Sequence, residues 1–183
     1  GEQRKTHALG DIFDVALKPD HKGPEGQIFY MAIDSKHPIV EGFGDTDQLP
    51  GGEYHIPLDA PGEHLLTIIP PYPNGIPEMV YPYARKEMDY RGKRSNDPGI
   101  IIREKDKSRL VYLPLDIDRN IWIQGSTDLS KLLQNSIGWM INGKTPVTVK
   151  GEGYIEIFAW ETSAGYALHI LNYNNPNMTM AST

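Results

Sequence analysis

The chain has 183 residues with 24 acidic and 18 basic side chains, a net charge of −6, and its length suits one domain with or without a small appendage. Because no lysine- or arginine-rich tract accompanies this acidic balance, the sequence argues against nucleic acid and against a membrane surface as partners. The chain contains no cysteine, which excludes disulfides, thiolate metal sites and a cysteine nucleophile.

The first half of the chain predicts short elements separated by loops. A short helix is expected over residues 8–15, because Leu9, Ile12 and Phe13 fall on one helical face. A turn is expected over residues 37–44, since Pro38 restricts the residue before it to extended geometry. Apolar runs bounded by turn residues predict strands at residues 27–33, 54–58 and 65–69.

A proline-rich run covers residues 70–98. It contains too many prolines for a helix or a central strand, so we predict a long surface excursion. Long loops of this kind are uncommon in compact domains unless they carry a function, which makes the run a candidate partner surface. The favoured alternative is an extended arm whose tyrosines pack against the domain.

The second half is more regular. Residues 99–103 and 109–113 predict a hairpin of buried strands. Residues 126–141 form the best helix of the sequence, with Ser126 or Thr127 as its N-cap. Its expected apolar stripe comprises Leu129, Leu132, Leu133, Ile137, Met140 and Ile141. Three further strands are expected at residues 147–149, 154–160 and 166–171, the last two joined as a hairpin.

Motifs for metals and cofactors are missing from the sequence. None of the six histidines pair at helical spacing and no HExxH occurs, so we expect no metal site. Neither GxGxxG nor a P-loop occurs, so we expect no nucleotide cofactor, and the absence of GxSxG removes the usual support for a serine hydrolase.

Two carboxylates remain, in the stretch YLPLDIDRNIW. If the chain stays extended there, Asp116 and Asp118 share one face about 6.6 Å apart, a spacing compatible with paired-carboxylate chemistry. In acid/base pairs, however, the two carboxylates usually approach from different segments. The favoured interpretation is structural: the aspartates accept backbone N–H bonds in the turn after a strand, and Arg119 pairs with one of them.

A longer pattern resembles a known family. It is carried by the run RLVYLPLDIDRNIW, followed by STDLSKLLQNSIGWMINGKTPVTVKGEGYIEIFAW and then ALHILNYNNPN, and the match extends over roughly residues 100–177. It resembles the C-terminal half of the trimerisation domain of beta-galactosidase-type glycoside hydrolases, a module similar to class I glutamine amidotransferases. RKTHALGDIFDVAL and KHPIVEGF resemble other parts of that module more weakly.

The resemblance implies an α/β fold with a flavodoxin-like, class I glutamine amidotransferase-like sheet that is incomplete at its N-terminus and carries a C-terminal β-hairpin extension. It implies an amidotransferase-like domain over residues 1–145 and a β-rich extension over 146–183. The amidotransferase triad is not carried over, because cysteine is absent and LDID stands where an active relative has its histidine.

The function that follows is a non-catalytic accessory or oligomerisation module of a beta-galactosidase-like, carbohydrate-active enzyme. Its expected partners are further copies of the chain or other segments of the parent chain. Two alternatives stay open: a glycoside hydrolase that uses Asp116 and Asp118, and a carbohydrate-binding module. The residues expected to bind sugar are Arg119, Trp122, Tyr81 and Tyr83, with Tyr90 as a further aromatic candidate.

The sequence does not fix the compartment. The opening residues carry no signal peptide, and a leader could lie upstream of Gly1, so both a cytoplasmic and an exported location fit. No apolar run approaches the roughly 20 residues that span a bilayer, so no membrane insertion is expected.

Overall fold

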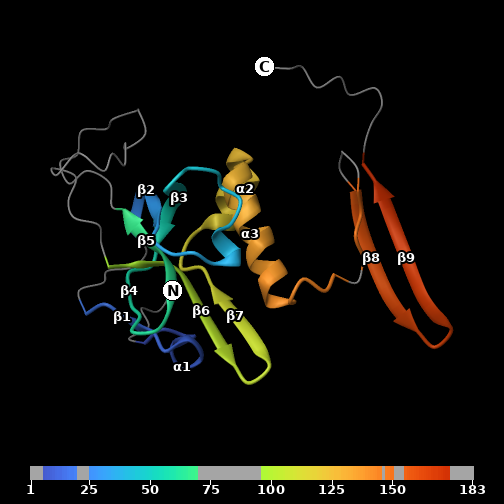
Figure 1. Cartoon of the computed structure of the whole chain (residues 1–183), viewed down its shortest axis with the longest axis horizontal. Helices are drawn as coiled ribbons and strands as arrows, with labels where there is room; N and C mark the ends of the chain where they lie inside the picture. Colours follow the sequence, from blue (N-terminus) through green and yellow to red (C-terminus); the bar gives the residue numbers. More distant parts are fainter. Residues whose placement is uncertain (1–5, 20–24, 70–95, 146, 151–154, 174–183) are drawn as a thin grey trace, which may run out of the picture. The chain divides into compact units, whose positions relative to one another are not determined.

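The computed structural model describes residues 6–19, 25–69, 96–145, 147–150 and 155–173. The chain divides into two compact units, Gly1–Gly143 and Lys144–Thr183. The first unit contains a five-stranded sheet with helices, and the second contains a β-hairpin (Figure 1). None of the helices in the described ranges is both long enough and apolar enough to cross a membrane.

The sheet of the first unit is antiparallel at every pair of neighbouring strands. Its strand order is β3-β2-β5-β6-β7. The strands are β2 (Glu25–Ile33), β3 (Gln48–His55), β5 (His64–Ile69), β6 (Pro98–Lys105) and β7 (Ser108–Tyr112). Two residues join β6 to β7, and so short a connection permits only antiparallel pairing.

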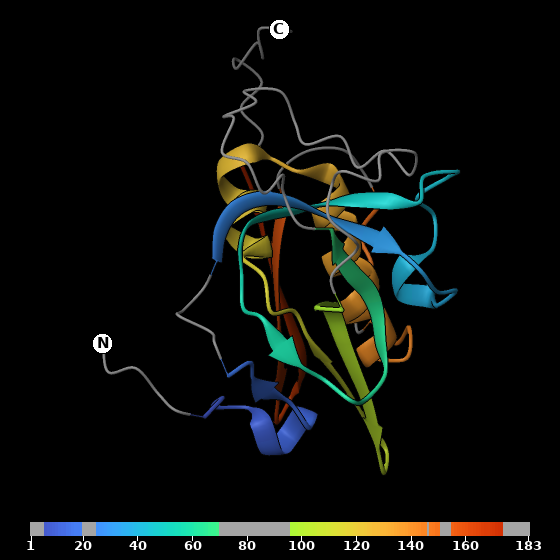
Figure 2. The ribbon, with the colours of Figure 1, turned by 90° about the vertical axis from the view of Figure 1, so that its left-hand side faces the viewer.

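The sheet is curled (Figure 2), and the segment that follows β7 connects its two outer strands, β3 and β7. After β7 the chain reaches the opposite edge, where Leu115 forms an isolated antiparallel bridge with His55 at the end of β3. The N–H of Ile56 also donates to the carbonyl oxygen of Pro114, at 2.9 Å. We call this junction between residues 53–56 and 113–116 the closure of the sheet.

Two helices follow the closure, α2 (Ile117–Gln124) and α3 (Thr127–Met140), and a 3-10 turn, η1 (Pro38–Val40), packs against α3. As predicted, Ser126 caps α3: its hydroxyl accepts the N–H of Leu129 at 3.4 Å. Together with the inner face of the sheet these elements form the main core, which includes Phe29, Met31, Leu66, Ile100 and Leu132.

The buried face of α3 differs from the predicted stripe. Leu129, Leu132, Ser136 and Trp139 are buried, whereas Ile137 is 45% exposed and Ile141 is 37% exposed. Ser136 is accommodated in the core because its hydroxyl donates to the carbonyl oxygen of Leu132, at 2.8 Å. The predicted stripe is therefore confirmed at Leu129 and Leu132, but it omits the buried Ser136 and Trp139.

The other face of the sheet carries a smaller core. The short helix α1 (Gly10–Phe13) and the two-stranded sheet of β1 (Ala16–Leu17) and β4 (Leu58–Asp59) lie over this face. Phe13, Val15 and Leu58 pack there with Ile101, while the neighbours of Ile101 in β6 belong to the main core. The unbroken run of isoleucines in β6 is explained by this burial on both faces.

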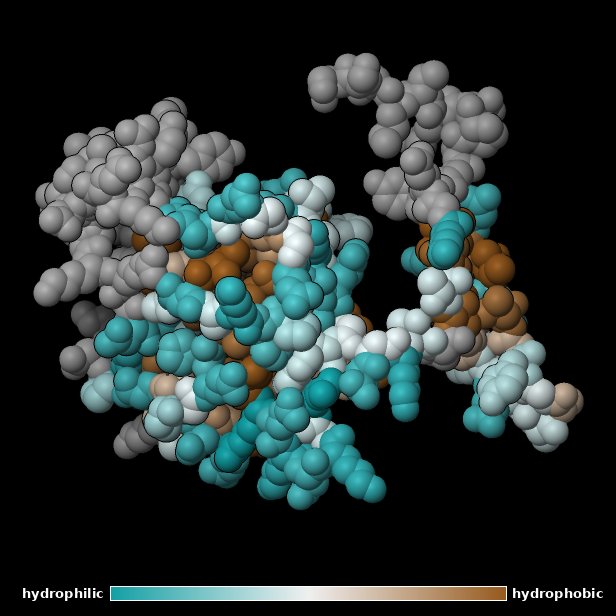
Figure 3. All heavy atoms as spheres, viewed as in Figure 1, coloured by the Kyte–Doolittle hydropathy of each residue, from teal (hydrophilic) through white to brown (hydrophobic). Residues whose placement is uncertain are grey.

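The second unit is a regular hairpin of β8 (Ile155–Thr162) and β9 (Gly165–Asn172). Its register is continuous from the pair Ile155 and Asn172 to the pair Thr162 and Gly165 at the turn. Apolar side chains are prominent on its surface (Figure 3).

The structure thus supports a mixed α/β chain with a C-terminal β-hairpin, and it corrects several finer predictions. A flavodoxin-like sheet is not confirmed, because that fold needs parallel strands and all described strand pairs are antiparallel. Residues 147–149 form no strand. The strand expected at residues 54–58 is split between the end of β3 and the short β4. Most of the predicted excursion, residues 70–95, lies outside the described residues.

Candidate functional site

Asp116 lies at the closure, where it joins the start of α2 to the end of β3. One carboxylate oxygen, Oδ1, accepts the backbone N–H groups of Glu53 at 3.1 Å and Tyr54 at 3.0 Å. The backbone N–H of Asp116 donates in turn to the carbonyl oxygen of Tyr54, at 3.1 Å. Asp116 therefore accepts backbone bonds, as the structural interpretation expects, but the donors come from a strand more than 60 residues away rather than from its own turn.

Two glycines allow this approach. Gly52 has φ +120, and a Cβ there would lie 2.5 Å from Oδ1 of Asp116 and 2.8 Å from Nδ2 of Asn120. A Cβ on Gly51 would lie only 2.1 Å from a ring carbon of Phe29. The pair of glycines in β3 thus leaves room for the aspartate on one side of the strand and for a core ring on the other.

Arg119 completes the cluster on the first turns of α2. Its Nη1 donates to Oε2 of Glu53 at 2.6 Å and to Oδ2 of Asp116 at 3.1 Å. These hydrogen bonds, first to Glu53 and then to Asp116, raise the pKa of the Arg119 guanidinium. The guanidinium also lies over the ring of Tyr54, 5.4 Å from its centroid. The other carboxylate oxygen of Asp116 is therefore occupied by a cation from its own helix.

The predicted paired-carboxylate geometry is not present. The chain is not extended at this point, because α2 begins at Ile117 and Asp116 is its N-cap residue. Asp118 lies in the first turn of the helix and is exposed, whereas Asp116 is turned toward β3. The two carboxylates do not share a strand face, which was the premise of the hydrolase interpretation.

The predicted sugar-binding residues are only partly within the described structure. Arg119 and Trp122 lie one turn apart on α2, and Trp122 is 89% exposed. Tyr81, Tyr83 and Tyr90 lie outside the described residues. Sequence reasoning missed Glu53 and Gln124, whose side chains approach each other at 3.5 Å beside Arg119. The pair of glycines just before Glu53 was the one available signal of a close approach there.

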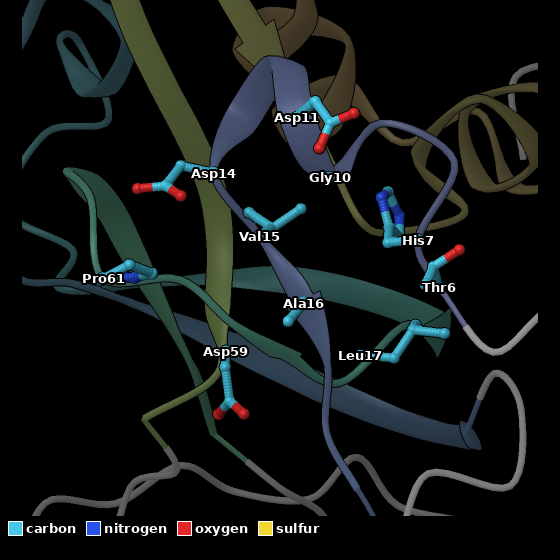
Figure 4. Close-up of a pocket in the computed structure, with 10 residues that line it drawn as sticks. All are labelled: Thr6, His7, Gly10, Asp11, Asp14, Val15, Ala16, Leu17, Asp59 and Pro61. Atoms are coloured by element: carbon cyan, nitrogen blue, oxygen red, sulfur yellow. The ribbon is translucent and has the colours of Figure 1, made fainter.

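A depression of about 420 Å³ lies around α1, β1 and β4, away from the closure. Asp11, Asp14 and Asp59 are among its lining residues, but their carboxylates point in different directions (Figure 4). Across the described ranges, no three histidine, aspartate or glutamate side chains are placed to hold a metal ion.

Two histidines serve as local backbone caps. Nδ1 of His7 accepts the N–H of Leu9 at 3.1 Å, and Nδ1 of His37 accepts the N–H of Ile39 at 3.2 Å. Burial lowers the pKa of both rings. For His37 the carboxylates of Glu63, Glu104 and Glu41 oppose this effect and the Arg109 guanidinium adds to it. The unprotonated Nδ1 atoms of His7 and His37 thus stabilise the local backbone by accepting these N–H groups.

The hairpin of the second unit is apolar on both faces. Cross-strand partners share a face, so Ile155, Ile157, Ala159, Leu168 and Ile170 form one surface, which we call the aliphatic face. Phe158, Trp160 and Leu171 lie on the other surface, which we call the aromatic face. Ile170 and Trp160 are each 58% exposed. Of the aspartate, glutamate, lysine and arginine residues, residues 155–173 contain only Glu156, on the aromatic face, and Glu161, on the aliphatic face.

Comparison with protein-family models, curated proteins and solved structures finds no match to this chain.

Proposed function

We propose that the chain is a non-catalytic assembly module, an accessory or oligomerisation domain of a beta-galactosidase-like, carbohydrate-active enzyme. The observation that carries the assembly role is the hairpin with apolar side chains on both faces. The carbohydrate-active parent is proposed from the resemblance of residues 100–177. A flavodoxin-like sheet within that parent would need parallel strands from outside the described residues.

The energetics of the hairpin support a protein partner. A two-stranded hairpin by itself is marginally stable in water. Large apolar side chains such as Leu168, Ile170 and Phe158 gain about 1.5 to 3 kcal/mol each when they are fully buried. Both long edges of the hairpin also lack a neighbouring strand within the described residues. A second copy that covers the aliphatic face would stabilise both hairpins at once.

The closure supports a structural rather than a catalytic role for its carboxylates. Each oxygen of Asp116 already accepts a hydrogen bond from the protein. A general acid or base needs a proton that it can exchange with substrate, and a nucleophile needs a free lone pair aimed at substrate. The hydrolase alternative therefore has little geometric support, and sugar binding without turnover is the better alternative.

Light scattering coupled to size exclusion tests the proposal on the intact chain. We expect the mass to rise above that of one chain, 20.6 kDa, as the protein concentration rises. A mass that stays at one chain at the highest soluble concentration would contradict an oligomerisation role.

A further inference from the structure

The outer side of α2 exposes a large aromatic ring beside a polar cluster. Trp122 is 89% exposed and its neighbour Ile123 is 62% exposed. Tyr54, at the end of β3, is also exposed and lies under Arg119. These residues belong to the first unit, whereas the hairpin that carries the assembly role belongs to the second.

The backbone that presents Trp122 is well anchored. Ile117 and Asn120 of α2 are buried, and Nδ2 of Asn120 donates to the carbonyl oxygen of Asp116 at 2.9 Å. Gly125, with φ +63, ends the helix, and its N–H donates to the carbonyl oxygen of Ile121 at 3.0 Å. A ligand that stacks on the indole therefore has little backbone to order, which lowers the entropic cost of binding.

A polar cluster begins one helical turn before Trp122. Arg119 precedes Trp122 by three residues, so the two side chains are neighbours on the helix surface. Nη1 of Arg119 holds Glu53 at 2.6 Å, and Nε2 of Gln124 approaches the other oxygen of Glu53 at 3.5 Å. A guanidinium has five N–H donors, and Arg119 bonds Glu53 and Asp116 through Nη1. A donor and an acceptor that hold each other thus lie within one helical turn of Trp122.

We propose that this surface binds a neutral saccharide, with one sugar ring stacked on Trp122 and its hydroxyls bonded to Arg119 and Glu53. One face of a pyranose presents C–H groups that pack against an aromatic ring. Each hydroxyl both donates and accepts, so it can bond a guanidinium donor and a carboxylate acceptor at the same time.

The charges of the cluster favour a neutral ligand. Glu53, Asp116 and Asp118 outnumber Arg119, so a phosphate or sulfate group would be repelled. A protein partner would have to take the Arg119 and Glu53 pair away from water, and this desolvation is costly. Sugar hydroxyls replace the hydrogen bonds that water makes to the same groups, so a saccharide avoids that cost.

A printed array of neutral and anionic glycans, probed with the intact chain, tests the proposal. We expect binding to neutral glycans, and we expect Trp122→Ala to weaken it about tenfold or more, since the stacking surface is lost. Trp122→Phe keeps a smaller ring and should restore part of the binding. Ile12→Ala is the matched control, because Ile12 is an exposed apolar residue on α1.

Three outcomes overturn the inference: no neutral glycan binds, anionic glycans bind best, or Trp122→Ala binds as the unchanged chain does. Because Trp122 is so exposed, the alanine variant should keep its fold, and an unchanged thermal unfolding midpoint checks this. If instead Trp122→Ala abolishes self-association without any glycan binding, α2 is a protein interface and the saccharide site is wrong. If the chain is a monomer in solution but still binds neutral glycans through Trp122, only the assembly proposal is wrong. The two proposals can therefore be contradicted separately.

Discussion

At the scale of single residues, Asp116 has the clearest role. A carboxylate that accepts two backbone N–H groups and a guanidinium joins β3, α2 and the segment after β7. Its removal would leave the N–H groups of Glu53 and Tyr54 without their charged acceptor. The residue that looked most like an acid or base in the sequence is thus placed to stabilise the fold.

Replacement of Asp116 by alanine should lower the free energy of unfolding by about 3 kcal/mol, because hydrogen bonds to charged groups contribute roughly 1.5 to 3 kcal/mol each and are only partly replaced by water. Asp118→Ala is the matched control, and its exposed position at the start of α2 predicts a loss of only about 0.5 kcal/mol. Urea titration of both variants measures the difference. Equal losses would mean that the closure does not depend on Asp116.

The capping histidines predict a pH dependence of stability. Burial holds the folded-state pKa of His7 and of His37 below 6.5, so the unfolded chain binds protons more tightly than the folded one. The stability that the two neutral histidines contribute to the folded state is fully present above pH 6.5, and it is lost as the pH falls through their lowered pKa values. Unfolding free energies at a series of pH values on either side of 6.5 should therefore decrease toward acid.

Asparagine at both positions provides the control, since its side-chain oxygen accepts the same backbone N–H without titrating in this range. The double variant His7→Asn with His37→Asn should show a flatter pH profile near 6.5. An identical profile in both proteins would rule out these caps as the source.

At the scale of elements, α3 shows where apolar periodicity misleads. Leu132 is fully buried, while Ile137 is nearly half exposed. We expect Leu132→Ala to cost about 3 kcal/mol of unfolding free energy and Ile137→Ala less than about 1 kcal/mol. The predicted apolar stripe would assign similar costs to both. A large loss in the Ile137 variant, measured by the same urea titration, would restore that stripe.

The sequence predicted those elements whose formation depends on residues close together in the chain. The cap at Ser126 and the hairpin of β6 and β7 follow from residues within a few positions of each other. The helix α2 was missed, although Asp116 precedes it and Gly125 follows it, because the apolar run before Asp116 favoured an extended interpretation. The start of β3 was missed because it contains Pro50, Gly51 and Gly52, and proline and glycine are depleted in strands.

Non-local contacts explain what the sequence could not provide. Nothing near Asp116 in the sequence indicates that Glu53 and Tyr54 are its partners, since their proximity arises only when the sheet curls. The antiparallel order of the strands is also a property of the whole sheet. The resemblance to an amidotransferase-like module led to a parallel sheet, which the described strands do not form.

At the scale of the whole molecule, two surfaces have different expected roles. The hairpin offers a largely aliphatic surface whose one charged residue, Glu161, lies near the turn, and such a surface suits burial against protein. The outer side of α2 offers one exposed ring a helical turn from the paired guanidinium and carboxylate of Arg119 and Glu53, which suits a hydroxyl-rich ligand. An accessory module that assembles through one unit and contacts saccharide through the other would combine both proposals.

The most direct measurement of the assembly role is the solution mass of the intact chain compared with its Leu168→Lys variant. Leu168 lies opposite Ala159 in the middle of the aliphatic face, so a lysine there would bury a charge in the interface. Ile12→Lys places the same charge on an exposed residue of the first unit and serves as the control. We predict a mass of more than one chain for the unchanged and control proteins and of one chain for Leu168→Lys. The same mass for all three proteins would contradict assembly through the hairpin.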